Sequence, residues 1–573
     1  MILVMALLDM FGIASIMPFI AIMSNPDLVD SNEYLNFIYH YIGMESKQEF
    51  LFYSGVVLLI ALVTSILFKA ATTYALLKFT HLKNYSMSKR LVEGYLQQSY
   101  EWFLHRHSAD LGKSILTEVE KVVGGALLSF IQLVAQGAVV LAVLVLLLIV
   151  DPLITAIVFV TLGILYTLIY SLLRKYLKTI GEQRIIANKD RYQIVQEMFG
   201  GIKDVKSTLI ERVMLNKFDG PAKAFAQTQA SAQVINHMPR FVLEALVFGT
   251  VIVIMLNMIA TPQAIEQALP VIAVYAFAGY RLLPALQQVF NHMASLRFSH
   301  SALVMLSKDM QRIYQIATDN FHEDSGKIRF EKRIELRGVG YTYPLSEQKT
   351  LRDINLVFEK NSITGVVGKT GSGKSTLIDI VMGLLSPGEG GIYIDNQPLK
   401  PNASRKWRRN IGYVPQQIFL LDDSIAANIA FGVPETAIDK DRIVEVAKIA
   451  NIHDFIMNEA EKGYQTLVGE RGVRLSGGQR QRIGIARALY HDPEILIFDE
   501  ATSALDNVTE QELITSLNNL QNKKTIIMIA HRLSSVKICS HIIFIEKGTI
   551  LDAGSYKDLS SRNRGFFDAA LQY

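Results

Sequence analysis

The chain has 573 residues, enough for more than one domain, and its 50% hydrophobic content and mean hydropathy of +0.25 are too apolar for an ordinary soluble protein. The net charge of +4 is small for this size, so the composition gives no reason to expect nucleic acid as a partner. The single cysteine, Cys539, excludes an intrachain disulfide and is compatible with a reducing compartment.

Six segments of the first half are apolar over the roughly 20 residues that a helix needs to cross a bilayer. The predicted spans cover about residues 2–23, 51–77, 122–150, 152–173, 241–260 and 265–290. Only the helix-breaking turn "VDPL" separates the third span from the fourth, so this turn can do no more than reverse the chain. The pattern predicts alternating spans in a membrane domain of residues 1–318.

The basic residues orient these spans, because Lys and Arg are retained on the cytoplasmic side. They gather after the second and fourth spans, whereas the other three loops contain only Lys47. The cytoplasmic set includes Lys83, Lys89, Arg90, Arg106, Lys113 and Lys121, then Arg174, Lys175, Lys178, Arg184, Lys189, Arg191, Lys203, Lys206, Arg212, Lys217 and Lys223. Both termini are therefore predicted to be cytoplasmic, with the spans continuing as helical rods into the cytosol.

The N-terminus opens on "ILVMALL", without the basic region or the small-residue cleavage site of a signal peptide. We interpret residues 2–23 as a first membrane span and expect that an upstream interfacial segment is missing from this sequence.

Two arginines in the membrane half are notable, because a guanidinium is costly in hydrocarbon. Arg281 interrupts the sixth span about 16 residues from its start, which places it roughly 24 Å below the outer boundary, in the inner-leaflet half. Arg240 opens the fifth span at a similar level. Together they could hold an anionic headgroup, since arginine binds phosphate bidentately. The alternative is internal pairing, of Arg240 with Glu244 and of Arg281 with Asp9.

A polar linker, residues 319–327, leads into a second domain, residues 328–573, in which a phosphate-binding pattern soon appears. An apolar strand, Ile363–Val367, runs into "GKTGSGKST" at the start of a helix. Its backbone N–H groups can wrap a β-phosphate, Lys374 can reach the β and γ oxygens, and the Ser375 hydroxyl can ligate Mg²⁺. The predicted ATP-binding residues of this loop are Gly368, Lys369, Thr370, Gly371, Ser372, Gly373, Lys374, Ser375 and Thr376.

Two more stretches complete a phosphate site. The buried strand "ILIFDE" delivers Asp499, typical of a Mg²⁺-orienting carboxylate, and Glu500, typical of a water-polarising one, although two solvated acids at a strand end are the alternative. The stretch "LSGGQRQR" places a serine and two glycines at a helix start, which makes a phosphate-binding nest without its own lysine. In isolation this stretch would be read as a loop.

With these motifs in order, residues from about 328 to 573 resemble the nucleotide-binding domain of an ABC transporter. The resemblance implies that Tyr343 stacks on the adenine, that Gln416 senses Mg²⁺ and substrate, and that residues 468–472 form the cross-talk loop of exporters. Each alone has a bland alternative: Tyr343 as a core aromatic, Gln416 as a solvated turn. The resemblance assigns the signature motif to Leu475, Ser476, Gly477, Gly478 and Gln479, the D-loop to Asp506 and the γ-phosphate switch to His531.

The same resemblance gives the expected roles and the expected fold. Catalysis falls to Glu500, His531 and Gln416, and Mg²⁺ to Ser375, Gln416 and Asp499. The expected fold class is an α-helical polytopic membrane domain of the type IV exporter kind fused to an α/β P-loop NTPase domain. In this family each ATP lies between the loop of one domain and the signature of another, so we expect a homodimer, with a heterodimer containing a degenerate partner as the alternative.

Exporters of this class also imply a mechanical joint, in which short helices at the cytoplasmic loop tips contact the nucleotide-binding domain near the Gln416 loop. The matching candidates are "SYEWFLHRHSADLGKSI" from Ser99, with Trp102 and Phe103 as packing residues, and "LIERVMLNKF" from Leu209. His105 and His107 have no third ligand, so a solvated loop is favoured over a metal site. The basic run "SRKWRR" at residues 404–409 is interpreted as a solvated face and not as a nucleic-acid contact.

Short membrane motifs, "MPFIAI", "MPRFVLE" and "YRLLP", resemble the bacterial lipid-linked oligosaccharide flippases. The resemblance implies that Arg240 and Arg281 hold the pyrophosphate of a polyprenyl-linked glycan at the bacterial inner membrane, although Gln288 stands where more basic character is expected. The alternative substrates are drugs, lipid A and peptides. A soluble ABC ATPase of DNA repair or translation is disfavoured by the six spans, and an importer by the fusion of spans and ATPase in one chain.

Overall fold

The structure is a computed structural model. It describes residues 26–43, 46–150, 152–259, 265–316, 326–344, 346–500, 523–529 and 536–562, with residues 4, 5, 7, 8, 19, 22, 23, 510–512 and 515 in addition. Some side chains of α10, α12 and α13 lie outside the description. The chain forms two compact units, of which the first comprises Met1–Gln98 and His105–Thr318 and the second Ser99–Leu104 and Asp319–Tyr573.

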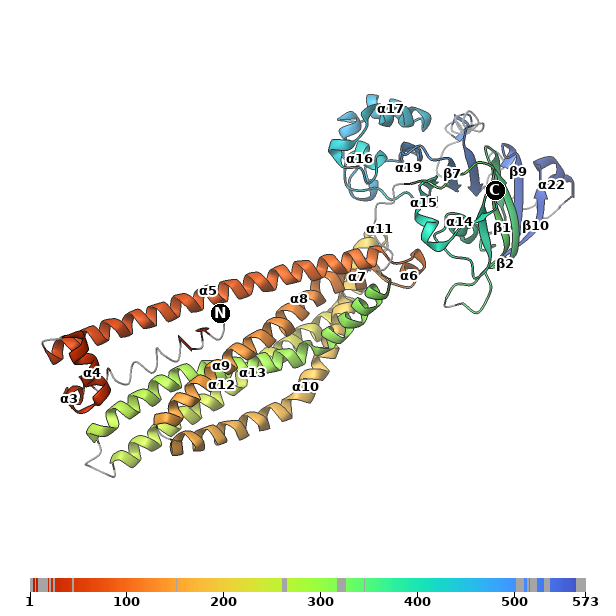
Figure 1. Cartoon of the computed structure of the whole chain (residues 1–573). Helices are drawn as coiled ribbons and strands as arrows, with labels where there is room; N and C mark the ends of the chain where they lie inside the picture. The colour runs from red at the N-terminus through yellow and green to blue at the C-terminus, as the bar shows by residue number, and fades with distance from the viewer. Residues whose placement is uncertain are drawn as a thin grey trace. The chain divides into compact units, whose positions relative to one another are not determined.

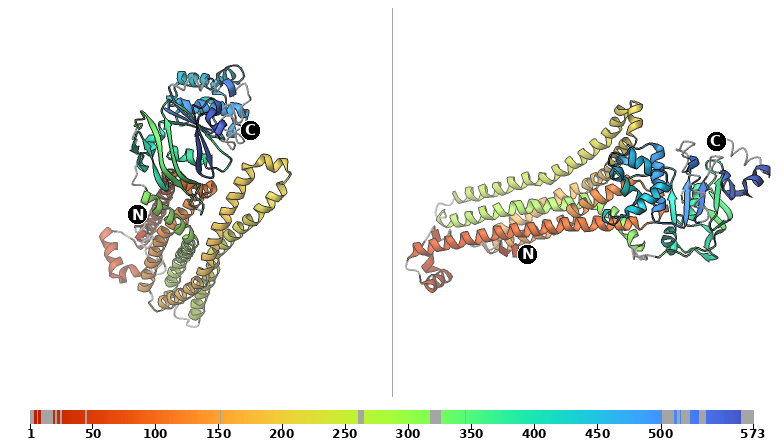
Figure 2. Two further views of the ribbon diagram at one scale, coloured as in Figure 1. Left: turned by 90° about the vertical axis from the view of Figure 1, so that its right-hand side faces the viewer. Right: turned by 90° about the horizontal axis from the view of Figure 1, so that it is seen from above.

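The first unit is helical. Its long helices, α5, α10, α12 and α13, contain 49 to 52 residues each, which at 1.5 Å per residue is about 75 Å, well over twice a bilayer core. They run alongside one another together with α9 in both views (Figures 1 and 2). The prediction that the spans continue as rods is confirmed. The helices are α3 (Leu28–Ser31), α4 (Glu33–Ile42), α5 (Lys47–Leu96), α7 (Ser108–Lys113), α8 (Val119–Val122), α9 (Leu128–Val150), α10 (Pro152–Gly200), α11 (Ile202–Ser207), α12 (Glu211–Ile259) and α13 (Ile265–Ile316), with the π-helical turns η1 (Ser114–Glu118) and η2 (Val123–Leu127).

Local chemistry explains where these helices begin. The Ser46 side chain accepts a hydrogen bond from the Glu49 N–H and so caps α5, and the Asn32 side chain caps α4 in the same way. Pro152 opens α10, because a proline lacks only an N–H that the first turn leaves unpaired. Helix α9 ends at Val150 and α10 begins at Pro152, so the third and fourth predicted spans belong to separate helices.

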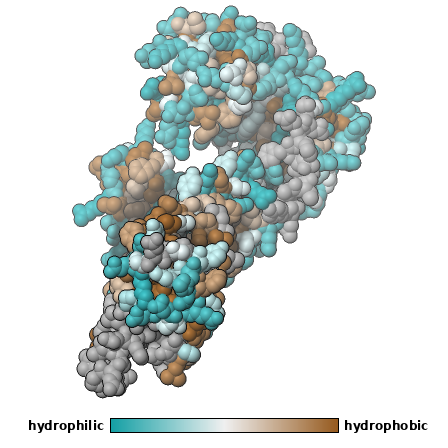
Figure 3. Space-filling view, turned by 60° about the vertical axis from the view of Figure 1, so that its left-hand side comes forward, coloured by the Kyte–Doolittle hydropathy of each residue, from teal (hydrophilic) through white to brown (hydrophobic). Residues whose placement is uncertain are grey.

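Large apolar side chains cover the outside of this unit. Phe52 is 69% exposed and Leu67 65% exposed on α5, and brown side chains gather on the helical part of Figure 3. Two described stretches, Lys47–Leu96 and Ser108–Ile149, contain a segment long and apolar enough to cross a membrane. Exposed apolar surface of this extent fits lipid and helix contacts better than water. The predicted first span, residues 2–23, lies mostly outside the described residues.

The second unit contains two sheets. The larger has the order β10-β9-β3-β8-β7-β6, in which β9, β3, β8, β7 and β6 are parallel and β10 pairs antiparallel at the edge. The smaller is antiparallel, in the order β2-β1-β4-β5. The strands are β1 (Arg333–Tyr341), β2 (Leu351–Glu359), β3 (Ile363–Val367), β4 (Glu389–Ile394), β5 (Gln397–Pro398), β6 (Ile411–Val414), β7 (Ile495–Asp499), β8 (Thr525–Ile529), β9 (His541–Glu546) and β10 (Thr549–Gly554).

Helices cover both faces of the parallel sheet, and the apolar core falls into two clusters. The central strands β3 and β8 are buried at every residue, as expected for parallel strands covered on both sides. The helices are α6 (Tyr100–Leu104), α14 (Lys374–Val381), α15 (Ser404–Arg408), α16 (Ile425–Ile429), α17 (Lys440–Ile449), α18 (His453–Asn458), α19 (Gly477–Tyr490) and α22 (Tyr556–Arg562).

The basic run at residues 404–409 is not the uniformly solvated face that its composition predicts. Trp407 is fully buried in α15 and donates a hydrogen bond from Nε1 to the carbonyl oxygen of Val381 at 2.8 Å. Arg408 donates to the carbonyl of Gly383 at 2.6 Å, while Arg405 and Arg409 are exposed. The interpretation was wrong at Trp407 and Arg408 because charge composition does not reveal which side of a short helix packs on the core.

Candidate nucleotide site

Sheet topology brings the predicted catalytic motifs to one edge of the parallel sheet. The phosphate loop follows β3, Gln416 comes two residues after β6, and Asp499 ends β7. These strands are parallel and joined through β8, so their carboxyl ends lie at the same edge. This edge is where open α/β sheets bind their ligands.

Two glycines of the phosphate loop have no substitute. Gly373 has φ of +102° at the N-cap of α14, and a Cβ there would lie 2.8 Å from Leu351 Cδ2. A Cβ on Gly368 would lie 2.1 Å from the carbonyl oxygen of Ile545 on β9. The loop therefore keeps its backbone N–H groups unshielded at the N-terminus of α14, where a phosphate can approach them.

Lys374 spans this loop from the first turn of α14. Its Nζ donates to the carbonyl oxygen of Gly368 at 2.7 Å and to that of Lys369 at 3.0 Å. Burial lowers the pKa of Lys374, while the charges of Glu500 and Asp499 act in the opposite direction. The ammonium thus stands between the loop carbonyls and the two carboxylates, where it can pair with phosphate oxygens.

The end of β7 presents its two carboxylates differently. Asp499 accepts a hydrogen bond from the Tyr413 hydroxyl of β6 at 3.3 Å. Glu500 has a positive φ of 51°, which costs a non-glycine residue about 1–3 kcal/mol. Its Oε2 accepts a hydrogen bond from Gln416 Nε2 at 2.7 Å, so the predicted base and the predicted sensor are in direct contact. The strain at Glu500 turns its carboxylate out of the strand register.

The donor set at this edge fits Mg²⁺. Mg²⁺ prefers oxygen ligands and is usually held by one or two carboxylates together with substrate phosphates. Ser375 in the first turn of α14 offers a hydroxyl, Gln416 after β6 an amide and Asp499 at the end of β7 a carboxylate. In the part of the chain that the structure describes, no group of three His, Cys, Asp or Glu residues could hold a metal by itself. The site therefore suits a metal that arrives with nucleotide.

The predicted adenine residue, Tyr343, follows β1 beside the phosphate loop. Its hydroxyl lies 3.1 Å from Thr376 Oγ1 of α14, and its ring meets that of Tyr341 edge to face, with centroids 5.0 Å apart. The ring is partly buried. The ring also packs against the apolar core cluster that contains Tyr341, so both the stacking role and the alternative of a core aromatic stay predictions.

The first predicted coupling segment contacts the nucleotide-binding domain, as expected. Helix α6 belongs to the second unit, and the Tyr341 hydroxyl donates to Glu101 Oε1 of α6 at 2.8 Å. Burial raises the pKa of Tyr100, and the nearby charge of Asp379 raises it further. Burial also raises the pKa of Tyr413, with Asp499 as the next cause and Tyr100 as a smaller one, so α6 lies near the strand that leads to Gln416. The second segment, around Leu209, lies between α11 and α12 with Leu209 81% exposed.

The signature serine caps a helix. Ser476 Oγ accepts a hydrogen bond from the Gln479 N–H at 3.2 Å, and Gln479 Oε1 accepts one from the Ser476 N–H at 2.8 Å, so α19 begins with a capping box. Arg480 donates to the carbonyls of Gly472 and Leu475, which ties the cross-talk loop to this helix start. The two glycines that follow Ser476 leave further N–H groups available to an anion.

Some predicted residues fall outside the description. Asp506, His531 and Asp9 lie outside the described residues, and the side chains of Arg240 and Arg281 lie outside the described parts of α12 and α13. Strand β8 ends at Ile529, two residues before His531 in the chain.

Sequence reasoning missed other polar contacts. It gave no role to Tyr341 or Glu101, which have no motif of their own, and it counted Arg184 only as a cytoplasmic charge. Arg184 is 2% exposed and forms an ion pair with the fully buried Glu118, to which Asn188 also donates. The sequence did contain a sign that Glu118 is buried, because this residue lies in a helical stretch rich in valine and glycine.

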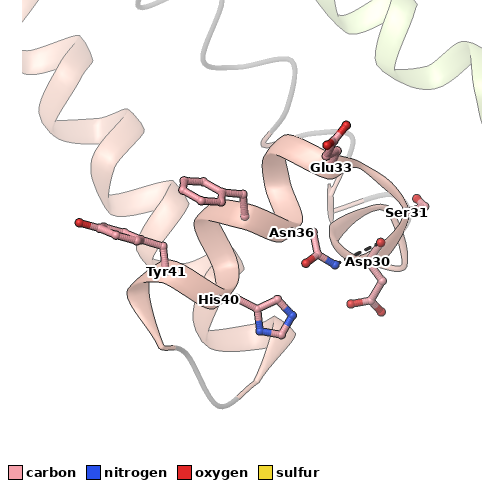
Figure 4. A pocket seen from close by; sticks show the side chains of 7 residues that line it. Asp30, Ser31, Glu33, Asn36, His40 and Tyr41 are labelled. Carbon is pink, nitrogen blue, oxygen red and sulfur yellow. Dashed lines mark hydrogen bonds between the residues drawn. The ribbon is translucent and has the colours of Figure 1, made fainter.

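An open pocket of about 680 Å³ on the surface of the helical unit was also not predicted from the sequence (Figure 4). It lies at α3 and α4, where Asn36 Nδ2 donates to the carbonyl oxygen of Asp30 at 3.2 Å. Lys47 binds the nearby Asp27 and Asp30 at 2.8 and 2.7 Å. The cavity is lined by Asp30, Ser31, Glu33, Asn36, Phe37, His40 and Tyr41. Its carboxylates do not suit the anionic substrate that the membrane arginines predict.

The phosphate loop, paired carboxylates and capped signature helix, on a parallel sheet fused to long apolar helices, define a P-loop ATPase built into a membrane protein. Residues 351–503 match the ABC transporter family and residues 7–282 the ABC transporter transmembrane region. The chain is 32% identical over 434 residues to an ATP-dependent lipid A-core flippase of Bordetella avium (strain 197N), covering 74% of this chain and 71% of the relative. It therefore belongs to the ABC transporter family, binds ATP and couples ATP hydrolysis to transport.

Two further comparisons agree with this membership. The alpha-hemolysin translocation ATP-binding protein HlyB of Escherichia coli is 40% identical over 255 residues, which cover 44% of this chain and 36% of that relative. The chain thus spans about a third of the length of that toxin translocator. A bacterial Atm1-family ABC exporter with ATP bound matches with a TM-score of 0.78 at 21% identity, over 99% of this chain and 96% of that one, so the expected exporter fold is confirmed.

Proposed function

We propose that two copies of this chain form a transporter in the bacterial inner membrane that moves a phosphate-bearing lipid from the cytoplasmic to the outer leaflet. The observation that carries the proposal is the pairing of a phosphate loop and its two carboxylates with a helical unit whose outside is apolar. A charged headgroup crosses hydrocarbon only at a high cost in free energy, whereas the lipid tails do not. Transfer between leaflets therefore requires a path that shields the headgroup, with ATP hydrolysis as the energy source.

In the proposed cycle the chain's own groups position and activate the reactants. The loop N–H groups and Lys374 hold the β- and γ-phosphates, Tyr343 stacks on the adenine, and Glu500 polarises the water that attacks the γ-phosphorus. The bond to the ADP oxygen then breaks, which yields ADP and inorganic phosphate. Mg²⁺, held by Ser375, Gln416 and Asp499, neutralises phosphate charge when bound.

The dimer proposal rests on the signature helix. The hydrogen bonds described for Ser476, Gln479 and Arg480 stay within residues 472–480 and do not involve the chain's own phosphate loop. A helix start that offers N–H groups without a lysine fits the far side of a nucleotide held by another copy. In this arrangement the loop of one protomer and the signature of its partner enclose each ATP.

Mixed dimers test this arrangement. Lys374→Ala and Ser476→Arg each inactivate both sites of a homodimer. If the signature acts on the partner's loop, a dimer of one Lys374→Ala chain and one Ser476→Arg chain keeps one intact site and occludes one nucleotide per dimer. If each chain completes its own site, the mixed dimer has no intact site and occludes none. ATP occlusion and ATPase activity of dual-tagged dimers in nanodiscs distinguish the two outcomes.

The finer identity of the lipid has two candidates. The membrane motifs favour a polyprenyl-pyrophosphate-linked oligosaccharide held by Arg240 and Arg281. The Bordetella relative favours a lipid A-type glycolipid. The test compares ATPase stimulation and leaflet transfer in proteoliposomes with polyprenyl-pyrophosphate glycan, lipopolysaccharide precursor and hydrophobic drug. Transfer of the drug alone would overturn the lipid proposal, and Arg281→Gln should abolish transfer of a pyrophosphate lipid while a drug exporter tolerates it.

A further inference from the structure

A small cavity that several polar side chains line among apolar ones lies between the helices of the first unit, where the sequence analysis predicted none. Its volume is about 230 Å³, and residues of three helices and Met5 line it. The lining residues are Lys69, Thr72, Thr73 and Leu76 of α5, Gln132, Ala135 and Gln136 of α9, Gln288 of α13, and Met5. We call this the Lys69 cavity.

The Lys69 cavity lies at the depth of the cytoplasmic leaflet. At 1.5 Å per residue Lys69 is about 27 Å along α5 from Leu51, where the predicted outer end of the span lies, and Gln136 is about 21 Å along α9 from Val150. Beyond it, α9 and α13 pack through an apolar cluster of Met5, Val139, Val143, Leu147, Leu282 and Ala285. The cavity thus ends where the dry part of the bundle begins.

Polar groups in this cavity lack protein partners. Thr72 is 5% exposed, and its Oγ1 is buried with no hydrogen-bond partner in the described part of the chain. The neighbouring Thr73 instead donates to the carbonyl oxygen of Lys69 at 2.8 Å, as threonines in helices often do. Gln136 is 8% exposed, Gln132 is partly buried and Gln288 is exposed, and none of the three has a side-chain hydrogen bond among the described residues. Buried polar groups without partners are rare, and a ligand is one way to satisfy them.

The cavity also contains a positive charge. No described carboxylate lies within 4.0 Å of Lys69, whereas Lys78, two turns further along α5, is exposed and lies 6.0 Å from the Tyr74 ring. A lysine within a membrane span marks a functional site by default, because its charge is costly there. An ammonium beside three amides and a hydroxyl offers a positive charge and several hydrogen-bond donors to a ligand, which is the chemistry that recognises phosphate oxygens.

The size of the cavity limits what it can hold. A volume of about 230 Å³ accommodates a phosphate group and its first few atoms, but not a whole glycolipid. The neighbouring α5 side chains Ile66 and Leu67 are 61% and 65% exposed, so apolar surface adjoins the cavity. A ligand with a phosphate head and hydrocarbon tails can bind the polar groups of the cavity and the adjoining apolar surface at the same time.

We propose that the Lys69 cavity binds the phosphate headgroup of a lipid drawn from the cytoplasmic leaflet, with Lys69 supplying the charge and Thr72, Gln132, Gln136 and Gln288 the hydrogen bonds. The proposal deepens the proposed function and rests on it, because it names where that lipid is first held. It differs from the sequence prediction in placing the initial contact at Lys69 and not at Arg240 or Arg281.

The test uses phosphatidic acid as the probe, in proteoliposomes of phosphatidylcholine with increasing shares of phosphatidic acid. Wild type should show ATPase stimulation that saturates with phosphatidic acid. Lys69→Gln should raise the half-saturating share by about tenfold or more, since a charge-assisted hydrogen bond is lost. Lys69→Arg should retain most of the response. Lys78→Gln on the same helix is the matched control and should behave as wild type.

Thr72→Val separates binding from structure. It removes the unpartnered hydroxyl at nearly constant volume, so a merely structural cavity would become more stable and respond to phosphatidic acid unchanged. A binding site would lose response. Glycerol 3-phosphate added to phosphatidylcholine liposomes distinguishes a lipid from a free phosphate: stimulation by it would overturn the lipid assignment.

Further outcomes of the same experiments test the inference and the proposed function separately. The inference is overturned if wild type does not respond to phosphatidic acid, or if Lys69→Gln and Lys78→Gln respond equally. If wild type responds and Lys69→Gln does not, but no lipid changes leaflet, the cavity stands and the proposed function fails. If lipid changes leaflet equally in wild type and Lys69→Gln, the function stands and the cavity inference fails.

Discussion

The two units differ in what surrounds their unpartnered buried polar groups: Ser372 Oγ of the ATPase unit lies in the phosphate loop, and Thr72 Oγ1 of the helical unit lies at the Lys69 cavity. In the ATPase unit, the buried Lys374, Trp407 and Asn428 all have hydrogen-bond partners in the described chain. In the helical unit, the Lys69 cavity contains polar groups without partners, and the ion pair of Glu118 and Arg184 is sealed from solvent. In both units an unpartnered buried hydroxyl therefore lies where a site must accept and release a ligand.

Loss of the catalytic carboxylate should have the largest effect. Glu500→Gln keeps the shape and the amide contact with Gln416 but removes the base, so ATPase activity should fall by about 100-fold or more. Steady-state phosphate release measures it. Glu445→Gln, which removes only a surface pair with Arg442, is the control. Activity within a few fold of wild type in Glu500→Gln would refute its assignment as the base.

Breaking the sealed ion pair of the helical unit should come next. Glu118→Gln leaves the 2% exposed Arg184 without its counter-charge, which should cost about 3–5 kcal/mol of unfolding free energy. Replacing both residues, by Leu at 118 and Met at 184, should recover most of it. Thermal unfolding in nanodiscs measures the change.

A matched pair on the same helix calibrates that result. Lys178 and Glu182 of α10 are 3.7 Å apart and about half exposed, so Glu182→Gln should cost less than about 1 kcal/mol. Equal losses of unfolding free energy in Glu118→Gln and Glu182→Gln would show that burial does not strengthen the dependence of stability on the first pair.

The contact between α6 and the nucleotide site should have a smaller effect. Tyr341→Phe removes the hydrogen bond to Glu101, a net contribution of about 0.5–1.5 kcal/mol, so the ratio of lipid-stimulated to basal ATPase should fall by up to about tenfold. Tyr393→Phe, on the neighbouring strand β4, is the control, since its ring stacks on Arg337. An unchanged ratio in Tyr341→Phe would show that this hydrogen bond carries no coupling.

The smallest expected effect concerns pH. Burial raises the pKa of Asp379 from 3.8 to about 6, with the charge of Asp499 as the second cause. The folded state then binds the proton more tightly than the unfolded state, so this group lowers stability as pH rises from about 4 to about 6, and the loss is complete above pH 6. With allowance for partial exposure, Asp379→Asn should raise unfolding free energy at pH 7.5 by about 1 kcal/mol.

Thermal unfolding of the full chain without ATP and Mg²⁺ at pH 5 and pH 7.5 checks this sign. The gain from Asp379→Asn should be larger at pH 7.5 than at pH 5. A gain that is equal at both pH values, or larger at pH 5, would contradict the assignment of Asp379 as a buried carboxyl.

The catalytic motifs were readable from the sequence because their chemistry is local. The stretch from Gly368 to Thr376 contains the loop, the lysine and the hydroxyl in nine consecutive residues, and the apolar strand before it predicts where they lie. Asp499 and Glu500 follow a buried strand for the same reason. The carboxyl ends of parallel strands lie at one edge of the sheet, whatever loops join the strands. The motifs that follow these strands therefore come together there.

Tertiary structure alone decided which polar residues are buried and which are in contact. Arg184 and Lys69 are each one basic residue among many along the helices. What distinguishes them comes from distant parts of the chain: Arg184 pairs with Glu118, and Lys69 lines a cavity together with amides of α9 and α13. Helix periodicity shows that a residue faces a neighbour but not which neighbour. The sequence by itself therefore determined the ATPase chemistry and the membrane architecture, while packing between helices decided where the charges lie, because the cost of a buried charge depends on what surrounds it.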